Sequence, residues 1–260
     1  EFLSILKEFP VQALGIEHRE DLVQIAKDAG LTVWRQFTET ENTILKSPDG
    51  KAGPPYHGFL SFNFLEHQPE PDKMLRCIWN NLEEDGVGLV TVPSLEYILE
   101  HNGYYELIRD HLAYYTFETL RSLMEHNGFR VVEEEMVNRD TLSVIVRKKA
   151  MTDKTAWERS AGIDIAGLVS SRQSINRQVN QLVNGLYEKG KTLAVWGASH
   201  QGFTLAATTG LGKGARYIMD SAPFKQGRFA PASHILIVAP DHFLEEPVDA
   251  ILIVAPGYTD

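Results

Sequence analysis

Apolar runs that predict strands alternate with amphipathic stretches that predict helices along most of this 260-residue chain. Residues 11–17 and 87–92 have the character of short buried strands, and residues 21–29, which end before Gly30, have the spacing of an amphipathic helix. Such alternation is typical of α/β proteins, because each helix carries the chain back across a parallel sheet. It restricts the fold class more than any other feature of the sequence, and it predicts an α/β protein.

The alternation is interrupted once, and this interruption divides the chain into two units. Residues 149–159 are polar and charged, residues 163–189 predict one long helix, and strands and helices alternate again from Thr192 onwards. We therefore expect a first domain over residues 1–149, a linker and long helix over residues 150–190, and a second domain over residues 191–260. Both domains have the strand and helix order of Rossmann-like folds.

Both ends of the first domain depart from simple alternation. Residues 129–137 and 141–148 predict two consecutive strands, which suits an antiparallel hairpin at the edge of an otherwise parallel sheet. At the other end, a helix is predicted from Phe2 to Phe9 and is ended by Pro10, with no strand or glycine-rich turn before it. We therefore expect a domain that lacks the N-terminal strand and glycine loop of a complete nucleotide-binding sheet.

Composition argues against several classes of partner. The chain has 25 Lys and Arg against 35 Asp and Glu, a net charge of −10, and no basic stripe, so we expect no nucleic-acid partner. We also expect no membrane association and a cytoplasmic location, because the chain has no long apolar run and no signal-peptide pattern. Cys77 is the only cysteine, and the histidines lack the spacing of a metal set, so no metal is predicted.

Two positions stand where ligands of such sheets bind, beyond the carboxyl ends of strands. Glu17 ends a predicted strand, where a carboxylate can accept both ribose hydroxyls of an adenosine cofactor. Its position alone leaves open an ordinary solvated loop acid. Residues 197–202, Gly-Ala-Ser-His-Gln-Gly, lie between a strand and a helix, where backbone N–H groups can receive a phosphate. A merely tight turn between the two elements is the alternative there.

Several separated blocks resemble the class I S-adenosylmethionine-dependent methyltransferases, and among them the sugar C-methyltransferase type with a second Rossmann-like domain. The blocks are Phe2-Leu3 with Leu14-Gly-Ile-Glu17, Phe62-Asn-Phe-Leu-Glu-His67, Gly86 to Pro93, and Gly128-Phe129. Together they span essentially all of residues 1–148. The resemblance implies S-adenosylmethionine as the cofactor. It implies cofactor-binding roles for Glu17, His18, Asn63, Phe64 and Glu66.

The most specific block is Asp110-His-Leu-Ala-Tyr-Tyr-Thr116. It is similar to an acid, His, Leu, Tyr, aromatic, Ser/Thr segment in sugar C-methyltransferases, whose histidine is a proposed base. The resemblance therefore implies catalytic roles for Asp110, His111 and Tyr114. Alkylation of carbon requires a proton to leave a position beside a carbonyl or enol, and histidine has a suitable intrinsic pKa. Without the resemblance, His111 and Tyr114 would be interpreted as residues that hold an irregular segment under a helix cap.

Two residues just before this block differ from the family pattern. The family often has Tyr or His there, whereas this chain has Ile108 and Arg109. This difference leaves open the exact acceptor and the choice between C-methylation and O-methylation.

The second domain resembles the C-terminal domain of the same enzymes, which helps to bind a nucleotide-sugar substrate. The resemblance implies substrate-binding roles for Gly197, Ser199, His200, Gly202, Lys225 and Arg228. Lys225 and Arg228 could contact phosphate, or they could be ordinary solvent-exposed side chains of a surface loop.

The leading hypothesis from the sequence is methyl transfer from S-adenosylmethionine to a small polar acceptor, such as a nucleotide-linked sugar, with His111 as the base. Two alternatives remain. One is a nicotinamide-dependent oxidoreductase or epimerase whose second domain binds the nucleotide. The other is a nucleotide-binding scaffold without catalysis, which the Ile108-Arg109 difference keeps open.

Overall fold

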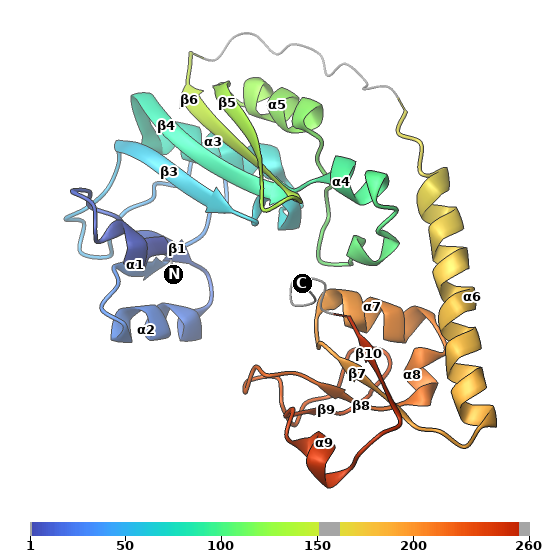
Figure 1. The fold of residues 1–260 in the computed structure, drawn as a ribbon. Helices are drawn as coiled ribbons and strands as arrows, with labels where there is room; N and C mark the ends of the chain where they lie inside the picture. Colours follow the sequence, from blue (N-terminus) through green and yellow to red (C-terminus); the bar gives the residue numbers. More distant parts are fainter. Residues whose placement is uncertain (1, 151–161, 255–260) are drawn as a thin grey trace. The chain divides into compact units, whose positions relative to one another are not determined.

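The fold was analysed in a computed structural model that describes residues 2–150 and 162–254. The chain forms two compact units (Figure 1). The first contains residues 1–95 and 112–160, and the second contains residues 96–111 and 161–260. Residues 96–111 are therefore part of the second unit, although they interrupt the sequence of the first. Each unit is described below by itself.

The first unit begins with a small parallel sheet. Its elements are helix α1 (Phe2–Leu6), strand β1 (Gly15–Glu17), helix α2 (Glu20–Asp28) and strand β2 (Val33–Arg35). Strand β1 pairs with β2 over three residues, and neither strand pairs with the larger sheet of the unit. The sequence had suggested one continuous sheet for this domain. The described residues of this domain instead form two sheets. Strands β1 and β2 make backbone hydrogen bonds only to each other and not to the larger sheet.

The larger sheet of the first unit has the strand order β3-β4-β6-β5. Its strands are β3 (Tyr56–Phe62), β4 (Leu82–Pro93), β5 (Phe129–Val137) and β6 (Thr141–Lys148). Strands β3 and β4 are parallel, whereas β6 runs antiparallel to both β4 and β5. The antiparallel hairpin at the edge of the sheet, predicted from two consecutive strands, is confirmed.

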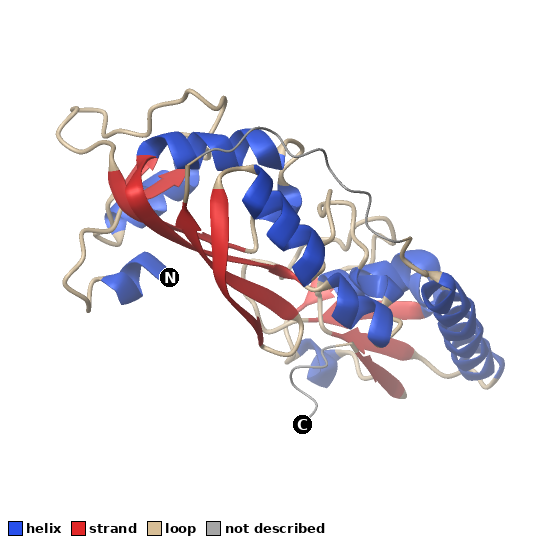
Figure 2. Ribbon diagram, turned by 90° about the horizontal axis from the view of Figure 1, so that it is seen from above, coloured by secondary structure: helices blue, strands red, loops and turns tan. Residues whose placement is uncertain are grey.

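Helix α3 (Pro71–Asn81) lies between β3 and β4 in the chain, and helix α5 (Phe117–His126) leads into β5. Figure 2 colours the helices of the chain blue and its strands red. The start of α5 follows directly from its sequence. The Thr116 side chain accepts a hydrogen bond from the Thr119 backbone N–H, and the Thr119 side chain bonds in return to the Thr116 backbone N–H, which forms a capping box. Gly128, with φ 82°, ends the helix in a left-handed conformation that glycine adopts without strain.

The core of the first unit lies between α3, α5 and one face of the larger sheet. Alternate residues of β4 and β6 point into it, among them Val90, Val92 and Val144, because successive side chains of a strand face opposite sides. Phe129 on β5 is fully buried in this core and its ring lies 5.7 Å from that of Phe59.

The second unit contains a four-stranded sheet with the order β10-β7-β8-β9, in which every pairing is parallel. Its strands are β7 (Leu193–Trp196), β8 (Ala215–Met219), β9 (Ile237–Val238) and β10 (Ala250–Ile253). Its longer helices are α6 (Ala166–Glu188) and α7 (His200–Thr208), and its short helices are α4 (Leu95–Glu100), α8 (Leu211–Gly214) and α9 (His242–Glu245). The expected second α/β unit is thus present as a parallel sheet with helices.

One side of helix α6 packs against the hydrophobic core of the second unit through Val179, Val183 and Leu186. The segment between β4 and α5 contains α4 and a 3-10 turn, η2 (Tyr104–Glu106). Within the described residues, no helix has both the length and the apolar character needed to cross a bilayer.

Replacing Phe129 with alanine should destabilise the first unit by about 3–5 kcal/mol, because the change removes a fully buried ring and leaves a cavity. The matched control is Val132→Ala on the same strand, where the side chain is 48% exposed. Urea unfolding followed by circular dichroism measures both effects. Equal losses of stability in the two variants would contradict the position assigned to Phe129.

Candidate functional site

The carboxyl ends of β1, β2 and β3 bring together several of the side chains singled out in the sequence. His18 follows β1, Phe37 follows β2 and Phe64 follows β3. The rings of His18 and Phe37 lie 6.1 Å apart, and those of Phe37 and Phe64 lie 6.5 Å apart, both with edge-to-face geometry. A row of three rings therefore connects the ends of strands that belong to two separate sheets.

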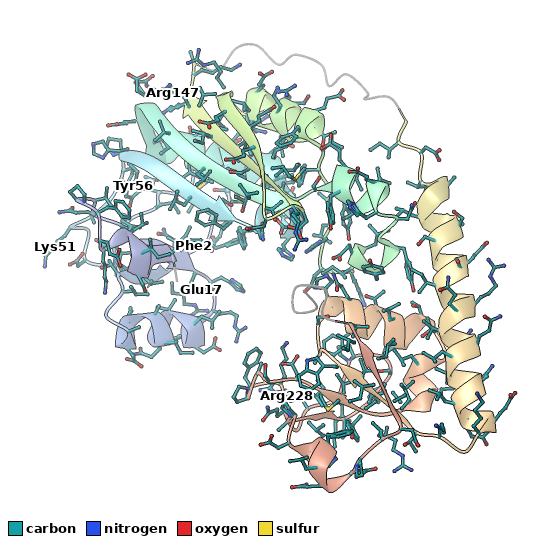
Figure 3. The ribbon with its side chains drawn as sticks, in the orientation of Figure 1. Phe2, Glu17, Lys51, Tyr56, Arg147 and Arg228 are labelled. Atoms are coloured by element: carbon teal, nitrogen blue, oxygen red, sulfur yellow. The ribbon has the colours of Figure 1, made fainter. Side chains whose placement is uncertain are left out.

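Glu17, labelled in Figure 3, is the last residue of β1 and directly precedes His18. Its carboxylate oxygen Oε1 accepts a hydrogen bond of 2.8 Å from the Arg19 backbone N–H and lies 3.0 Å from Nδ1 of His18. Within the described part of the chain, the other oxygen, Oε2, takes part in neither contact nor in another hydrogen bond. The Glu17 side chain is 29% exposed, so one carboxylate oxygen is held by the protein while the other can receive a ligand hydroxyl.

Asn63 shapes the turn at the end of β3. Its φ of 42° is left-handed, a conformation that asparagine tolerates better than most residues. Its backbone N–H donates to the Thr91 carbonyl at 2.9 Å, and the Thr91 hydroxyl donates to the Asn63 side-chain oxygen at 3.1 Å. These bonds to β4 fix the direction in which the chain leaves β3 towards Phe64.

Glu66 is buried rather than open to a ligand. It is 1% exposed, and Oε2 has no hydrogen-bond partner among the described residues. Burial raises the pKa of this carboxyl, against smaller opposing contributions from a backbone hydrogen bond and from His67. Its backbone carbonyl accepts hydrogen bonds from the N–H groups of Leu112 and Ala113, at 2.8 and 3.2 Å. Glu66 therefore anchors the chain that follows His111.

Tyr115 lies near the same carboxyl. Its hydroxyl is buried without a hydrogen-bond partner in the described structure. Burial, together with the negative charges of Glu66 and Asp72, raises the pKa of Tyr115 to about 12. The phenol is therefore protonated at neutral pH, a state in which its hydroxyl can both donate and accept a hydrogen bond.

Asp110 and His111 follow η2 in a tight turn, in which the His111 N–H donates to the Ile108 carbonyl at 3.3 Å. Asp110 is exposed, His111 is half-buried, and Tyr114 is half-buried a little further on. His111 is the last residue of the segment 96–111, which belongs to the second unit, and Leu112 is the first residue after it that belongs to the first unit.

In the second unit, residues 197–202 form a tight turn from β7 into α7. Ser199 caps the helix, because its hydroxyl accepts a hydrogen bond from the Gly202 N–H at 3.3 Å. Gly197 has φ 112°, and a Cβ atom on Gly202 would lie 2.5 Å from the Gly197 carbonyl oxygen. Close packing of the turn accounts for both glycines. A phosphate-binding role for them remains a prediction.

Lys225 holds the loop after β8 against this turn. Its ammonium group donates to the Ala198 carbonyl at 2.9 Å and to the Asp220 carboxylate at 3.0 Å. Burial alone would raise the pKa of Asp220, but hydrogen bonds from the Ala222 N–H, Lys225 and the Ala198 N–H outweigh it and lower this pKa. The Lys225 ammonium group therefore already has two hydrogen-bond acceptors within the protein.

Arg228 lies on the same loop and is exposed (Figure 3). Its backbone carbonyl accepts from the Ile237 N–H at 2.8 Å, which ties the loop to β9. Phe224 and Phe229 are 72% and 63% exposed, so this ordered loop presents two rings and a guanidinium to solvent.

His200 and its neighbour Gln201 are engaged by Glu106, whose carboxylate Oε2 lies 2.6 Å from Nε2 of His200. The sequence patterns assigned no role to Glu106, Phe37 or Asp220. Asp220 and Phe37 could have been found by the strand-end rule applied to Glu17. Nothing local marks Glu106, because its partners lie far away in the sequence.

Replacing Lys225 with methionine should destabilise the second unit by about 1–3 kcal/mol, because the Ala198 carbonyl and the Asp220 carboxylate each lose the hydrogen bond from its ammonium group. Arg228→Met on the same loop is the control and should leave stability nearly unchanged. The pKa of Asp220 is lower in the folded protein than in the unfolded chain. Its ionised carboxylate therefore contributes to the free energy of unfolding above the unfolded-state pKa, and this contribution is lost as the pH falls through the folded-state pKa. The difference between the two variants in thermal unfolding should therefore shrink below about pH 4. A Lys225→Met protein as stable as the control at neutral pH would contradict this role.

Comparison with known proteins identifies the two parts of the chain. Residues 1–134 match the family model of a methyltransferase domain, and residues 138–260 match that of a C-methyltransferase C-terminal domain. The C-methyltransferase NovU of Streptomyces niveus is 27% identical over 98% of this chain, and the chain spans 64% of that relative's length.

Among solved structures, one similar chain is the 1,6-didemethyltoxoflavin-N1-methyltransferase of Burkholderia thailandensis, with 16% identity and a TM-score of 0.41 over 56% of this chain and 65% of that one. Another is the magnesium protoporphyrin IX methyltransferase of Synechocystis PCC 6803, with 11% identity and a TM-score of 0.40 over 56% and 64% of the two chains. Since the two family models together account for nearly every residue, this chain belongs to the S-adenosylmethionine-dependent methyltransferases, as a methyltransferase domain followed by a C-methyltransferase C-terminal domain.

Proposed function

We propose that the protein containing this chain methylates a carbon atom of a small polar acceptor, and that the acceptor is a nucleotide-linked sugar. The observation that carries the proposal is the succession of a methyltransferase domain and a C-methyltransferase C-terminal domain in one chain. The similarity to NovU over nearly the whole chain supports transfer to carbon. It also favours methyl transfer over the nicotinamide-dependent alternative.

The residues at the ends of β1, β2 and β3 fit the adenosine part of S-adenosylmethionine. Oε2 of Glu17 is in place to accept ribose hydroxyls, while Oε1 is held by the Arg19 N–H. Phe37 and Phe64 offer apolar ring surfaces beside it, of the kind against which a purine packs. When bound, the cofactor supplies the methyl group: the bond from methyl to sulfur breaks, its electron pair stays on sulfur, and the methyl carbon becomes bonded to the acceptor carbon.

We assign the proton transfer to His111. The acceptor carbon, beside a carbonyl, loses a proton to the imidazole, and the electron pair left behind forms the new carbon–carbon bond. An imidazole is suited to this step because its ordinary pKa lies near neutral pH. Asp110 would orient the ring, and Tyr114 would line the acceptor site.

The loop that carries Arg228 is the part of the second unit best suited to a nucleotide. Lys225 and His200 are already bonded to protein carboxylates, whereas Arg228 is exposed between Phe224 and Phe229. A guanidinium pairs well with phosphate oxygens, and exposed rings can stack on a base. We therefore assign phosphate recognition to Arg228, with Gly197, Ser199 and Gly202 shaping the nearby turn.

Glu17→Gln should weaken S-adenosylmethionine binding by roughly tenfold or more, because the charged acceptor for the ribose hydroxyls is lost. Glu20→Gln, three positions further on, is the matched control. Its side chain is 81% exposed and contacts Arg35. Isothermal titration of the full-length protein measures both dissociation constants. Unchanged binding by the Glu17 variant would remove the ribose assignment.

His111→Ala should preserve cofactor binding but lower turnover by roughly a hundredfold or more, because general base catalysis is lost. Transfer of a tritiated methyl group to a panel of nucleoside-diphosphate keto-sugars measures turnover in the full-length protein. His57→Ala is the control, because His57 has a side chain that is 91% exposed. Near-normal turnover in the His111 variant would refute its role, and cofactor binding without any transfer by the wild type would favour the scaffold alternative.

A further inference from the structure

The segment Glu96–His111 is attached to helix α7 by two side chains of its 3-10 turn η2. The Tyr104 and Thr208 hydroxyls lie 3.2 Å apart. The two carboxylate oxygens of Glu106 contact Nε2 of His200 and Nε2 of Gln201. All these residues belong to the second unit, so its helix α7 holds a segment that lies, in sequence, between β4 and α5 of the first unit.

Glu106 is well suited to hold this segment. His200 and Gln201 are the first two residues of α7, where the helix dipole favours a negative group. Burial by itself would raise the pKa of Glu106, but a hydrogen bond and charge from His200, a hydrogen bond from Gln201 and the charge of His111 together lower it. Glu106 is therefore an anion at neutral pH, and its side chain is only 24% exposed.

The attachment point is close to His111 along the chain. After η2, which ends at Glu106, the chain turns so that the His111 N–H bonds to the Ile108 carbonyl. Only Leu107 to Asp110 separate Glu106 from His111 along the chain. Movement of Glu106 would thus be passed directly to His111, and a displacement of about 1 Å at a reacting group can cost roughly a hundredfold in rate.

We propose that Glu106 is a positioning residue: through its bonds to His200 and Gln201 it fixes the place of His111, so that helix α7 of the second unit sets the position of the base. The proposal rests on the proposed function of His111. It also gives His200 a role different from the substrate binding that the sequence suggested, because its imidazole is used to hold Glu106.

The first test measures methyl transfer by the full-length protein. Glu106→Ala and His200→Ala should each lower kcat by roughly tenfold or more while the dissociation constant of S-adenosylmethionine stays unchanged. The double variant should be no slower than the slower single variant, because both changes break the same contact. Glu100→Ala is the control, an exposed acid on α4 of the same segment. Normal kcat in Glu106→Ala, or independent and multiplying effects in the double variant, would overturn the proposal.

The second test does not need an acceptor. Hydrogen–deuterium exchange should become faster in peptides covering residues 104–111 of Glu106→Ala, and should stay unchanged in β7 and β8. Unchanged exchange at residues 104–111 would overturn the proposal, as would an equal increase throughout the sheet, because Glu106 would then support the fold of the unit rather than the segment. If the wild-type protein transfers no methyl group, the proposed function fails, while this measurement still decides whether Glu106 holds the segment.

Discussion

The backbone hydrogen bonding of β4 is the constraint on which the first unit depends. This strand pairs in parallel with β3 on one side and antiparallel with β6 on the other. Its alternate residues enter the core, and Phe59 of β3 lies directly over Gly88, where a Cβ atom would approach the ring to 2.0 Å. Near its carboxyl end, Thr91 holds Asn63 through two groups. The path of the chain towards Phe64 and Glu66 is therefore determined by how β4 is paired.

The candidate site residues of the first unit differ in how far they are buried. Glu17 keeps one carboxylate oxygen engaged and the other accessible, which suits ligand binding. Glu66 and Tyr115 are buried, and burial raises the pKa of both groups. Burial removes water from both groups, and an ionised group loses more solvation free energy than a neutral one. Such groups are better suited to shaping and anchoring the chain beside His111 than to direct contact with a polar cofactor.

In the second unit, most of the polar side chains near the start of α7 already have protein partners. Ser199 caps the helix, Lys225 bridges Ala198 and Asp220, and Glu106 takes the contacts of His200 and Gln201. Glu106 thus contacts the His200 side chain, for which a substrate-binding role was predicted. The exposed Arg228 and its aromatic neighbours become the better candidates for recognition of an external ligand, and α7 becomes an anchor for the segment of His111.

The sequence by itself determined the α/β class, the edge hairpin, the cap at Thr116, the long helix after the polar linker and the place of Glu17 at a strand end. Each of these follows from local periodicity or from the backbone preferences of one or two residues, which are present in the sequence before any folding. The tertiary structure alone decided that β1 and β2 form a separate sheet, that Phe37 lies between His18 and Phe64, and that Glu106 binds His200. These outcomes depend on which distant residues meet when the chain packs, and no short-range pattern specifies the partner of a side chain that lies nearly a hundred positions away.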